Sequence, residues 1–228
     1  LKMFDMSSPK FYLSPGKTLY VAASSSSNFK SDDCTGFTLD RLRQLKKHAF
    51  IDLLDTHEAW WAQYWNKAFV MLGDPGLEKA YYRALYTMGS ASRDLDFPPG
   101  IFGTWVTGER PEWNGDYHLN YNHQAPFYGL FSANRIEQAL PYNYPIIAMT
   151  DRARRYARET FNIDGIYMPV GIGPMGIDTT YSGPEAGRPR QFYLDHGFVD
   201  AGALCFHQRS NALHCINNMA MLCYYSYD

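Results

Sequence analysis

Apolar residues recur at helical spacing along most of the chain. Between Thr38 and Tyr64 they lie three, four or seven positions apart, which predicts one long helix or two broken ones. Asp74 followed by Pro75 is typical of a helix start, an N-cap before a proline at the first helical position, and this helix is predicted to reach about Ser90. Further helices are predicted over 125–139, over 145–161 and from about 199 to 225.

The remaining segments are predicted to be extended or irregular. Residues 11–23 predict two short strands around the turn Ser14-Pro15-Gly16-Lys17, and the polar stretch 24–33 predicts a linker. Residues 97–117 and 171–190 are rich in glycine and proline, which predicts long loops. Long loops inside a compact domain are usually functional, so the pattern favours an enzyme cleft carried by antiparallel helices.

Composition narrows the classes of function. The chain has 21 basic and 23 acidic residues, a net charge of −2, whereas proteins that bind nucleic acid or anionic membranes carry a basic excess. No apolar run approaches the roughly 20 residues of a membrane span. We therefore expect no nucleic-acid partner and no membrane partner. Aromatic residues are abundant, with 18 Tyr, 14 Phe and 5 Trp, and they favour either a large aromatic core or ring platforms for sugars.

Polar residues occupy every second position in part of the 97–117 loop and the residues after it. The set is Asp116, His118, Asn120, Asn122 and Gln124, and we call it the polar row. In an extended segment these side chains point to one side. A carboxylate, an imidazole and three amides on one face are suited to bind sugar hydroxyls or to hold a water. The alternative is a polar edge strand that faces solvent.

The sequence gives little support for a cofactor or a metal ion. Residues 171–176 match G-x-G-x-x-G, but a dinucleotide site needs a helix directly after this motif, and prolines within and beyond it prevent one. The pairs His118/His123 and His207/His214 lack further ligands at metal-binding spacing. We therefore expect no cofactor and no metal.

The segment 98–124 also carries a family resemblance. Its motifs are, in order, Pro98-Pro99, Gly103-Thr104-Trp105, Trp113 and Asn120-Tyr121-Asn122-His123-Gln124. With these motifs the segment resembles the entry to the catalytic barrel of family 95 glycoside hydrolases, the α-L-fucosidase family of the six-hairpin (α/α)6 glycosidases. Further along, Asn134-Arg135-Ile136-Glu137 followed by Pro141 resembles a helix of the same family.

The resemblance implies a fold and a domain order. It implies a mainly α fold, part of an (α/α)6 six-hairpin barrel preceded by the end of a β-sandwich domain. The implied boundaries are 1–30 for the end of the sandwich, 31–72 for a helical linker and 73–228 for an incomplete portion of the barrel. Twelve barrel helices of about 11–12 residues, with their loops, need well over 228 residues, so we expect further domains of the same chain. The family also implies a secreted or periplasmic protein.

The resemblance implies a reaction as well. The implied function is hydrolysis of a glycosidic bond in an oligosaccharide or polysaccharide, with inversion, by an α-L-fucosidase-like glycoside hydrolase. Asn120 and Asn122 are the implied catalytic residues, because amides can orient the attacking water without competing for its proton. The implied substrate-binding residues are Trp105, Trp113, Asp116, His118 and Gln124.

Two other functions stay open at this point. Where the fucosidases carry a stretch rich in histidine and asparagine, this chain has residues 168–173, and its general acid is unassigned. Asp178, Glu185 and Asp195 are loop carboxylates that could approach a cleft. The alternatives are a non-catalytic carbohydrate-binding protein on the same scaffold and a purely structural helical domain.

Overall fold

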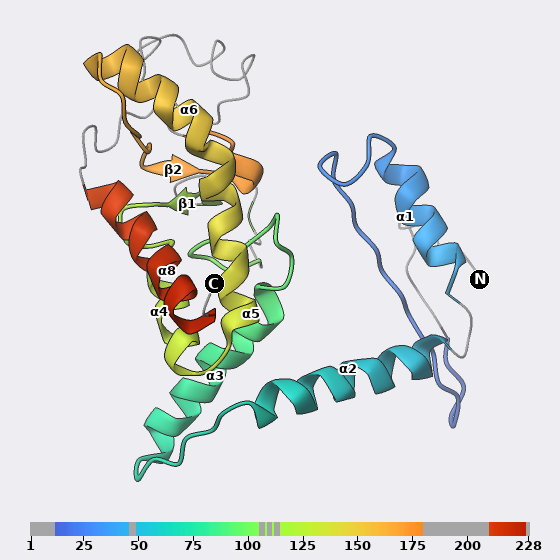
Figure 1. Ribbon diagram of the computed structural model, residues 1–228. Helices are drawn as coiled ribbons and strands as arrows, with labels where there is room; N and C mark the ends of the chain where they lie inside the picture. Colours follow the sequence, from blue (N-terminus) through green and yellow to red (C-terminus); the bar gives the residue numbers. More distant parts are fainter. Residues whose placement is uncertain are drawn as a thin grey trace. The chain divides into compact units, whose positions relative to one another are not determined.

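The structure is a computed structural model that describes residues 12–45, 49–104, 108, 111, 115–179 and 210–226. Its contacts divide the chain into two units, Leu1–Gln63 and Tyr64–Asp228. Figure 1 shows that helices make up most of the regular structure, which confirms the predicted mainly α fold. Among the described residues, no helix combines the length and the apolar composition that crossing a membrane requires.

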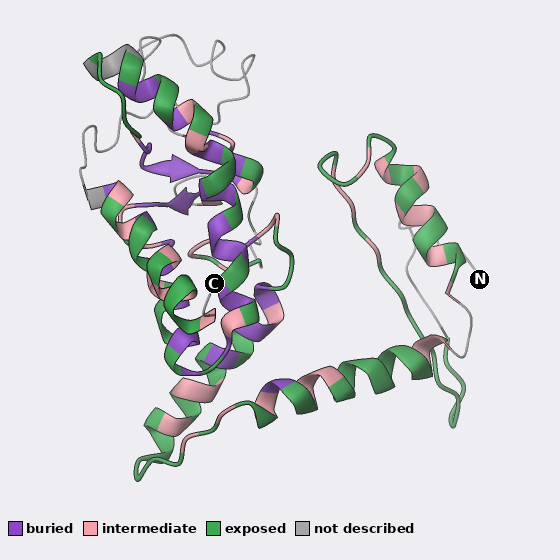
Figure 2. Ribbon diagram, viewed as in Figure 1, coloured by how far each residue is buried: buried purple, intermediate pink, exposed green. Residues whose placement is uncertain are grey.

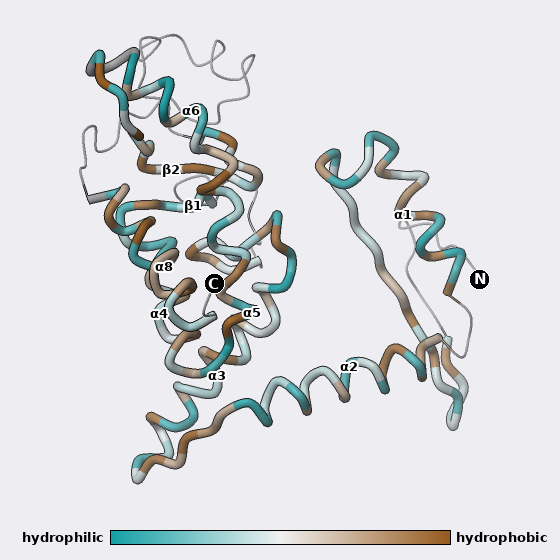
Figure 3. The backbone as a smooth tube through the Cα atoms, in the orientation of Figure 1, coloured by the Kyte–Doolittle hydropathy of each residue, from teal (hydrophilic) through white to brown (hydrophobic). Residues whose placement is uncertain are grey.

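The first unit contains α1 (Cys34–Arg43) and most of α2 (Ala49–Asn66), so the periodicity over 38–64 belongs to two helices. Asp33 caps α1, since its Oδ1 accepts a hydrogen bond from Gly36 N at 2.8 Å. None of the described side chains of this unit is buried (Figure 2). Figure 3 shows hydrophobic and hydrophilic residues alternating along α2. Within this unit the apolar residues of α2 are therefore exposed or half-buried.

The strands predicted over 11–23 are wrong for the described part of that segment, which contains neither. The predicted turn is present, because Lys17 N donates to Ser14 O at 3.1 Å and Gly16 adopts a φ of +75°. A two-stranded hairpin alone is marginally stable in water, and Tyr12 is 99% exposed. The prediction of the turn is therefore confirmed, but the flanking residues lack the packed face that a strand pair needs.

The second unit begins at the end of α2 and continues into α3 (Pro75–Ala91). α3 starts as predicted, because Asp74 Oδ1 accepts a hydrogen bond from Gly76 N at 2.7 Å in the first turn. The buried Tyr64 then joins the two helices, since its hydroxyl donates to Leu85 O at 2.7 Å. The end of α2 and the middle of α3 are thereby held together.

The described residues after α3 form further helices and a small sheet. They are α4 (Ala125–Ser132), α5 (Ile136–Ala139), η2 (Leu140–Tyr142), α6 (Asn143–Phe161), η3 (Pro174–Gly176) and α8 (Ser210–Ser226). The helix predicted over 125–139 is interrupted near Asn134, which has a φ of +55°. The predicted last helix is described from Ser210, and 199–209 lie outside the described residues.

The sheet brings together two segments that are distant in the sequence. β1 (Tyr117–His118) pairs antiparallel with β2 (Gly171–Ile172), with Tyr117 opposite Ile172. β2 therefore lies within the stretch 171–190 that was predicted to be a loop, and residues 180–190 lie outside the described residues. This pairing places the start of the polar row against the segment that precedes η3.

The core of the second unit lies between the sheet and the helices. Its side chains with at most 1% exposure include Leu119, Phe127, Leu130, Tyr142, Met149, Tyr156 and Ile172. Gly176 shows how closely η3 approaches α6, because a Cβ at this position would lie 2.6 Å from Met149 N. Glycine is also suited to its φ of +72°. The start of the polar row, beside the sheet, therefore lies next to the packed core.

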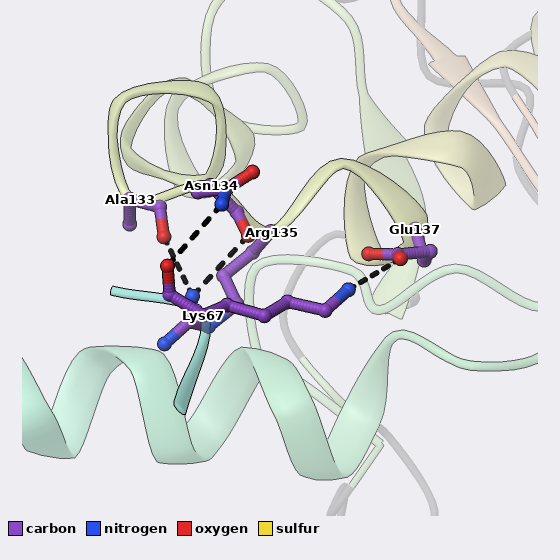
Figure 4. A network of polar contacts seen from close by, with 5 residues as sticks. All are labelled: Lys67, Ala133, Asn134, Arg135 and Glu137. Carbon is purple, nitrogen blue, oxygen red and sulfur yellow. Dashed lines mark hydrogen bonds and ion pairs between the residues drawn. The ribbon is translucent and has the colours of Figure 1, made fainter. Parts of the chain in front are cut away.

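A buried arginine ties the segment after α2 to the connection between α4 and α5. Arg135 is 0% exposed, and its Nη2 donates to Ala68 O at 3.2 Å. The neighbouring Asn134 Nδ2 donates to Lys67 O at 3.3 Å, and Lys67 Nζ forms an ion pair with Glu137 (Figure 4). These contacts fix the backbone that follows α2 onto the second unit.

Candidate functional site

The polar row follows a strand for two residues and then enters a tight turn. Only Tyr117 and His118 belong to β1, and the chain reverses over 119–124. Two backbone hydrogen bonds close the turn, from His123 N to His118 O at 2.8 Å and from Gln124 N to Tyr121 O at 3.0 Å. The condition under which all five side chains would share one face, an extended segment, is therefore not met beyond His118.

Gln124 holds the turn in place from inside. Its side chain is 0% exposed, its Oε1 accepts from Tyr121 N at 3.1 Å, and its Nε2 donates to Leu119 O at 2.6 Å. Its own carbonyl accepts from Asn218 Nδ2 on α8 at 3.1 Å. Gln124 was predicted to bind sugar hydroxyls, but in the structure its amide is buried and bonded to the turn. Its amide therefore supports the turn through contacts with other described residues.

Asp116 and His118 form a buried polar pair at the sheet. Each is 5% exposed, and His118 Nδ1 lies 3.2 Å from Asp116 Oδ1. The other carboxylate oxygen of Asp116 accepts from Thr179 Oγ1 at 3.3 Å. Gly171 leaves space for this carboxylate, because a Cβ there would overlap Asp116 Oδ2. Both oxygens of Asp116 thus have partners within the protein, and the carboxylate can fix the orientation of the His118 ring.

Asn120 and Asn122, the predicted catalytic residues, both lie in the turn and are half-buried. The Oδ1 atom of Asn120 is buried and has no hydrogen-bond partner among the described residues. A buried acceptor without a partner costs free energy unless a water or a ligand group satisfies it. Tyr121, which separates the two amides, has a φ of +129°, a conformation that non-glycine residues rarely adopt. The turn therefore contains a buried acceptor without a partner among the described residues, next to a strained residue.

His123 forms the floor of the turn as an uncharged ring. It is 0% exposed and stacks between Tyr117, at a centroid distance of 4.7 Å, and Tyr142, at 4.9 Å. Burial lowers the pKa of His123 to about 3, and burial also raises the pKa values of Tyr117 and Tyr142. All three rings are therefore neutral near pH 7.

The other predicted residues are only partly visible. Trp105 and Trp113, the predicted walls of the sugar subsite, lie outside the described residues, as do Glu185 and Asp195. Asp178 is 0% exposed and accepts a hydrogen bond from Tyr156 OH at 2.6 Å. This carboxylate therefore braces α6 against the residues after η3, in the protein interior.

Residues 171–176 contain a short strand and a short 3-10 helix. Gly171 lies in β2, and the motif ends in η3, which has only three residues, where the fingerprint requires a full helix. Within the described part of the chain, no three His, Cys, Asp or Glu side chains gather in a way that could hold a metal ion.

Thr179 is a contributor that sequence reasoning missed. It is 6% exposed and donates to Asp116, although 63 positions separate the two residues. No local pattern marks a threonine in a loop as a partner of a distant carboxylate. The pairing of β1 with β2, which no local pattern marks either, is what brings them together.

The chain matches known proteins over the same region. The family model described as the glycosyl hydrolase family 95 catalytic domain matches residues 41–187, more than half of the chain. This range contains α3, the complete polar row and β2, and it confirms the resemblance drawn from the motifs. No solved structure matches the chain.

Two curated relatives match shorter stretches. Probable alpha-fucosidase A of Aspergillus oryzae is 42% identical over 60 residues, which are 25% of this chain and 8% of the relative. Probable alpha-fucosidase A of Aspergillus niger is 40% identical over 53 residues, which are 23% of this chain and 7% of the relative. The matched stretches thus span less than a tenth of either relative's length.

Proposed function

Because the chain belongs to glycosyl hydrolase family 95, we propose that it hydrolyses glycosidic bonds in oligosaccharides or polysaccharides. The observation that carries the proposal is the turn 119–124, which lies inside the matched range and holds a buried amide oxygen without a partner. Such an acceptor is suited to bind one hydrogen of a water molecule. L-Fucosides are the first substrates to test, since both relatives are named as probable alpha-fucosidases.

In the proposed mechanism, Asn120 and Asn122 hold the attacking water on one side of the sugar ring. Asn120 Oδ1 accepts one water hydrogen, and the Asn122 amide fixes the orientation of the oxygen. A carboxylate base then takes the remaining proton while a carboxylic acid protonates the leaving oxygen, which inverts the anomeric centre. Inversion requires the two carboxyl groups to stand roughly 6.5–9.5 Å apart, with the water between the base and the sugar.

We propose different roles for the other members of the polar row. His118 is the member we propose to bind a sugar hydroxyl, and Asp116 is proposed as a positioning residue that holds the His118 ring through Nδ1. Gln124 supports the turn that carries Asn120 and Asn122. Trp105 and Trp113 remain the proposed stacking surfaces for the sugar.

The proposal includes the architecture implied by the family. The helices of the second unit would form part of an (α/α)6 six-hairpin barrel, with a β-sandwich before it in the complete protein. The general acid and base would be supplied by residues that have not yet been assigned or by further domains of the same chain. A secreted or periplasmic location fits a hydrolase that acts on polysaccharides.

The test is a pair of variants in the full-length protein, assayed on aryl α-L-fucosides and on fucosylated oligosaccharides. Asn120→Ala and Asn122→Ala are each expected to lower kcat by about 100-fold with little change in KM, because the water loses its fixed position. Asn217→Ala, at an exposed position of α8, is the matched control and is expected to keep the wild-type rate. Proton NMR of the first product formed identifies the anomer and hence inversion or retention.

Two outcomes would overturn the proposal. Wild-type rates in both variants, with folding retained, would remove the two amides from the mechanism. Glycan binding without turnover in the wild-type protein would instead identify a non-catalytic carbohydrate-binding protein.

A further inference from the structure

A groove with a volume of about 670 Å³ opens on the second unit, away from the polar row in the sequence. It is lined by Trp65, Phe69, Lys79, Tyr82, Arg83 and Tyr86. Four of these six side chains are aromatic, the other two are cationic, and none is acidic. The surface of the groove is mainly apolar, and Lys79 and Arg83 are the charged residues of its lining.

The aromatic wall of the groove is fixed by hydrogen bonds. Tyr82 OH donates to Val70 O at 2.8 Å and accepts from Val70 N at 3.1 Å, so its ring cannot swing away from the chain that follows α2. Arg135 also holds this segment, through a hydrogen bond to Ala68 O. Trp65 meets Tyr82 edge to face, with centroids 5.9 Å apart. The wall is therefore formed before any ligand arrives, which lowers the entropic cost of binding.

The positive charges run beside the rings along α3. Lys79 and Arg83 are one helical turn apart, and Tyr82 and Tyr86 follow with the same spacing, so the two rows are parallel. Four residues of helix advance by about 6 Å, which is close to the length of one sugar ring in a polymer. Both cationic side chains are exposed, and neither forms an ion pair with a described residue.

We propose that this groove binds a stretch of anionic polysaccharide, a chain of sugars that carry carboxylates. The C–H faces of successive sugars stack on Tyr82 and Tyr86, and their carboxylates pair with Lys79 and Arg83. A single-stranded nucleic acid also binds through rings and cations, and we favour a polysaccharide because the chain belongs to a glycoside hydrolase family. The inference rests on the proposed function only for the class of ligand, since this groove would hold substrate chains without cleaving them.

The test measures binding to polygalacturonate by affinity electrophoresis and calorimetry, with the neutral polymer dextran for comparison. Wild-type protein is expected to bind polygalacturonate and not dextran, with an affinity that falls as sodium chloride rises. The double variant Lys79→Ala/Arg83→Ala and the single variant Tyr86→Ala are each expected to weaken binding at least tenfold. The matched control, Arg154→Ala/Arg158→Ala on α6, removes the same charge from exposed positions and is expected to bind as wild type.

The outcomes separate this site from the proposed active site. Asn120→Ala is expected to leave polygalacturonate binding unchanged, whether or not the protein turns over fucosides. No binding to polygalacturonate, equal binding to dextran, or unchanged binding in both groove variants would overturn the proposal. Tighter binding of a single-stranded oligonucleotide than of polygalacturonate would also overturn it and would identify a nucleic-acid surface. Circular dichroism of each variant shows that a loss of binding is not a loss of fold.

Discussion

The buried imidazole of His123 makes a specific prediction about acid stability. Its pKa in the folded protein is about 3, because burial between Tyr117 and Tyr142 disfavours the charged form. In the unfolded chain a histidine has a pKa of about 6.5. The unfolded state therefore binds a proton that the folded state does not bind. The free energy of unfolding falls as the pH falls from about 6.5 to about 3. Between pH 7 and pH 5 this single group should cost about 2 kcal/mol of unfolding free energy.

The variant His123→Phe isolates this contribution. Phenylalanine keeps a ring between the two tyrosines and cannot be protonated. Any strain from its larger ring acts equally at both pH values and cancels in the difference. Urea unfolding at pH 7 and pH 5, followed by near-ultraviolet circular dichroism, should show that the variant loses about 2 kcal/mol less than the wild type.

A control variant and an NMR titration complete the experiment. His57→Phe, at an exposed position of α2, is the matched control for replacing a histidine by phenylalanine. The NMR titration of the His123 ring protons should show no charging above pH 5. Equal acid sensitivity in wild type and His123→Phe, or a ring that titrates near pH 6, would refute the reasoning.

Two further substitutions test how α3 and the turn are held. Asp74→Ala removes the cap of α3 and should cost about 1 kcal/mol of unfolding free energy in urea, while Asp151→Ala at an exposed position of α6 should change it by about 0.5 kcal/mol or less. An equal effect of the two would contradict the capping role. Gln124→Ala leaves buried backbone groups without partners and should cost about 2–4 kcal/mol, whereas Gln63→Ala, exposed on α2, should be nearly neutral. Near-wild-type stability of Gln124→Ala would show that the turn does not need its clamp.

Local signals predicted the parts of the fold that depend on local physics. The start of α3 follows from Asp74 and Pro75, because a cap and a proline act within one turn of helix. α6 begins at Asn143, two positions before the predicted proline start, since apolar spacing locates a helix better than its ends. The motifs of 98–124 predicted the family, and the family model confirms it. The structure of these residues was predicted only in part.

Contacts between distant segments were beyond local reasoning. The alternation from Asp116 to Gln124 reads as a strand, but only the two residues that pair with β2 are extended. After His118 the chain turns because Gln124 bonds back to its own turn and α8 closes over it through Asn218. Asn134 likewise breaks a periodic helix by adopting a left-handed conformation, which asparagine tolerates better than most residues.

The construction of the turn supports its proposed role independently of the family. Tyr121 lies between Asn120 and Asn122 with a φ of +129°, and a backbone conformation of this kind costs about 1–3 kcal/mol. Such strain persists only where neighbouring contacts over-determine the structure, and here Gln124 Oε1 holds the Tyr121 amide at 3.1 Å. The strained residue sets the spacing and direction of the two amides that flank it. Strain beside a buried acceptor without a partner among the described residues is what a site that fixes a water in one orientation requires.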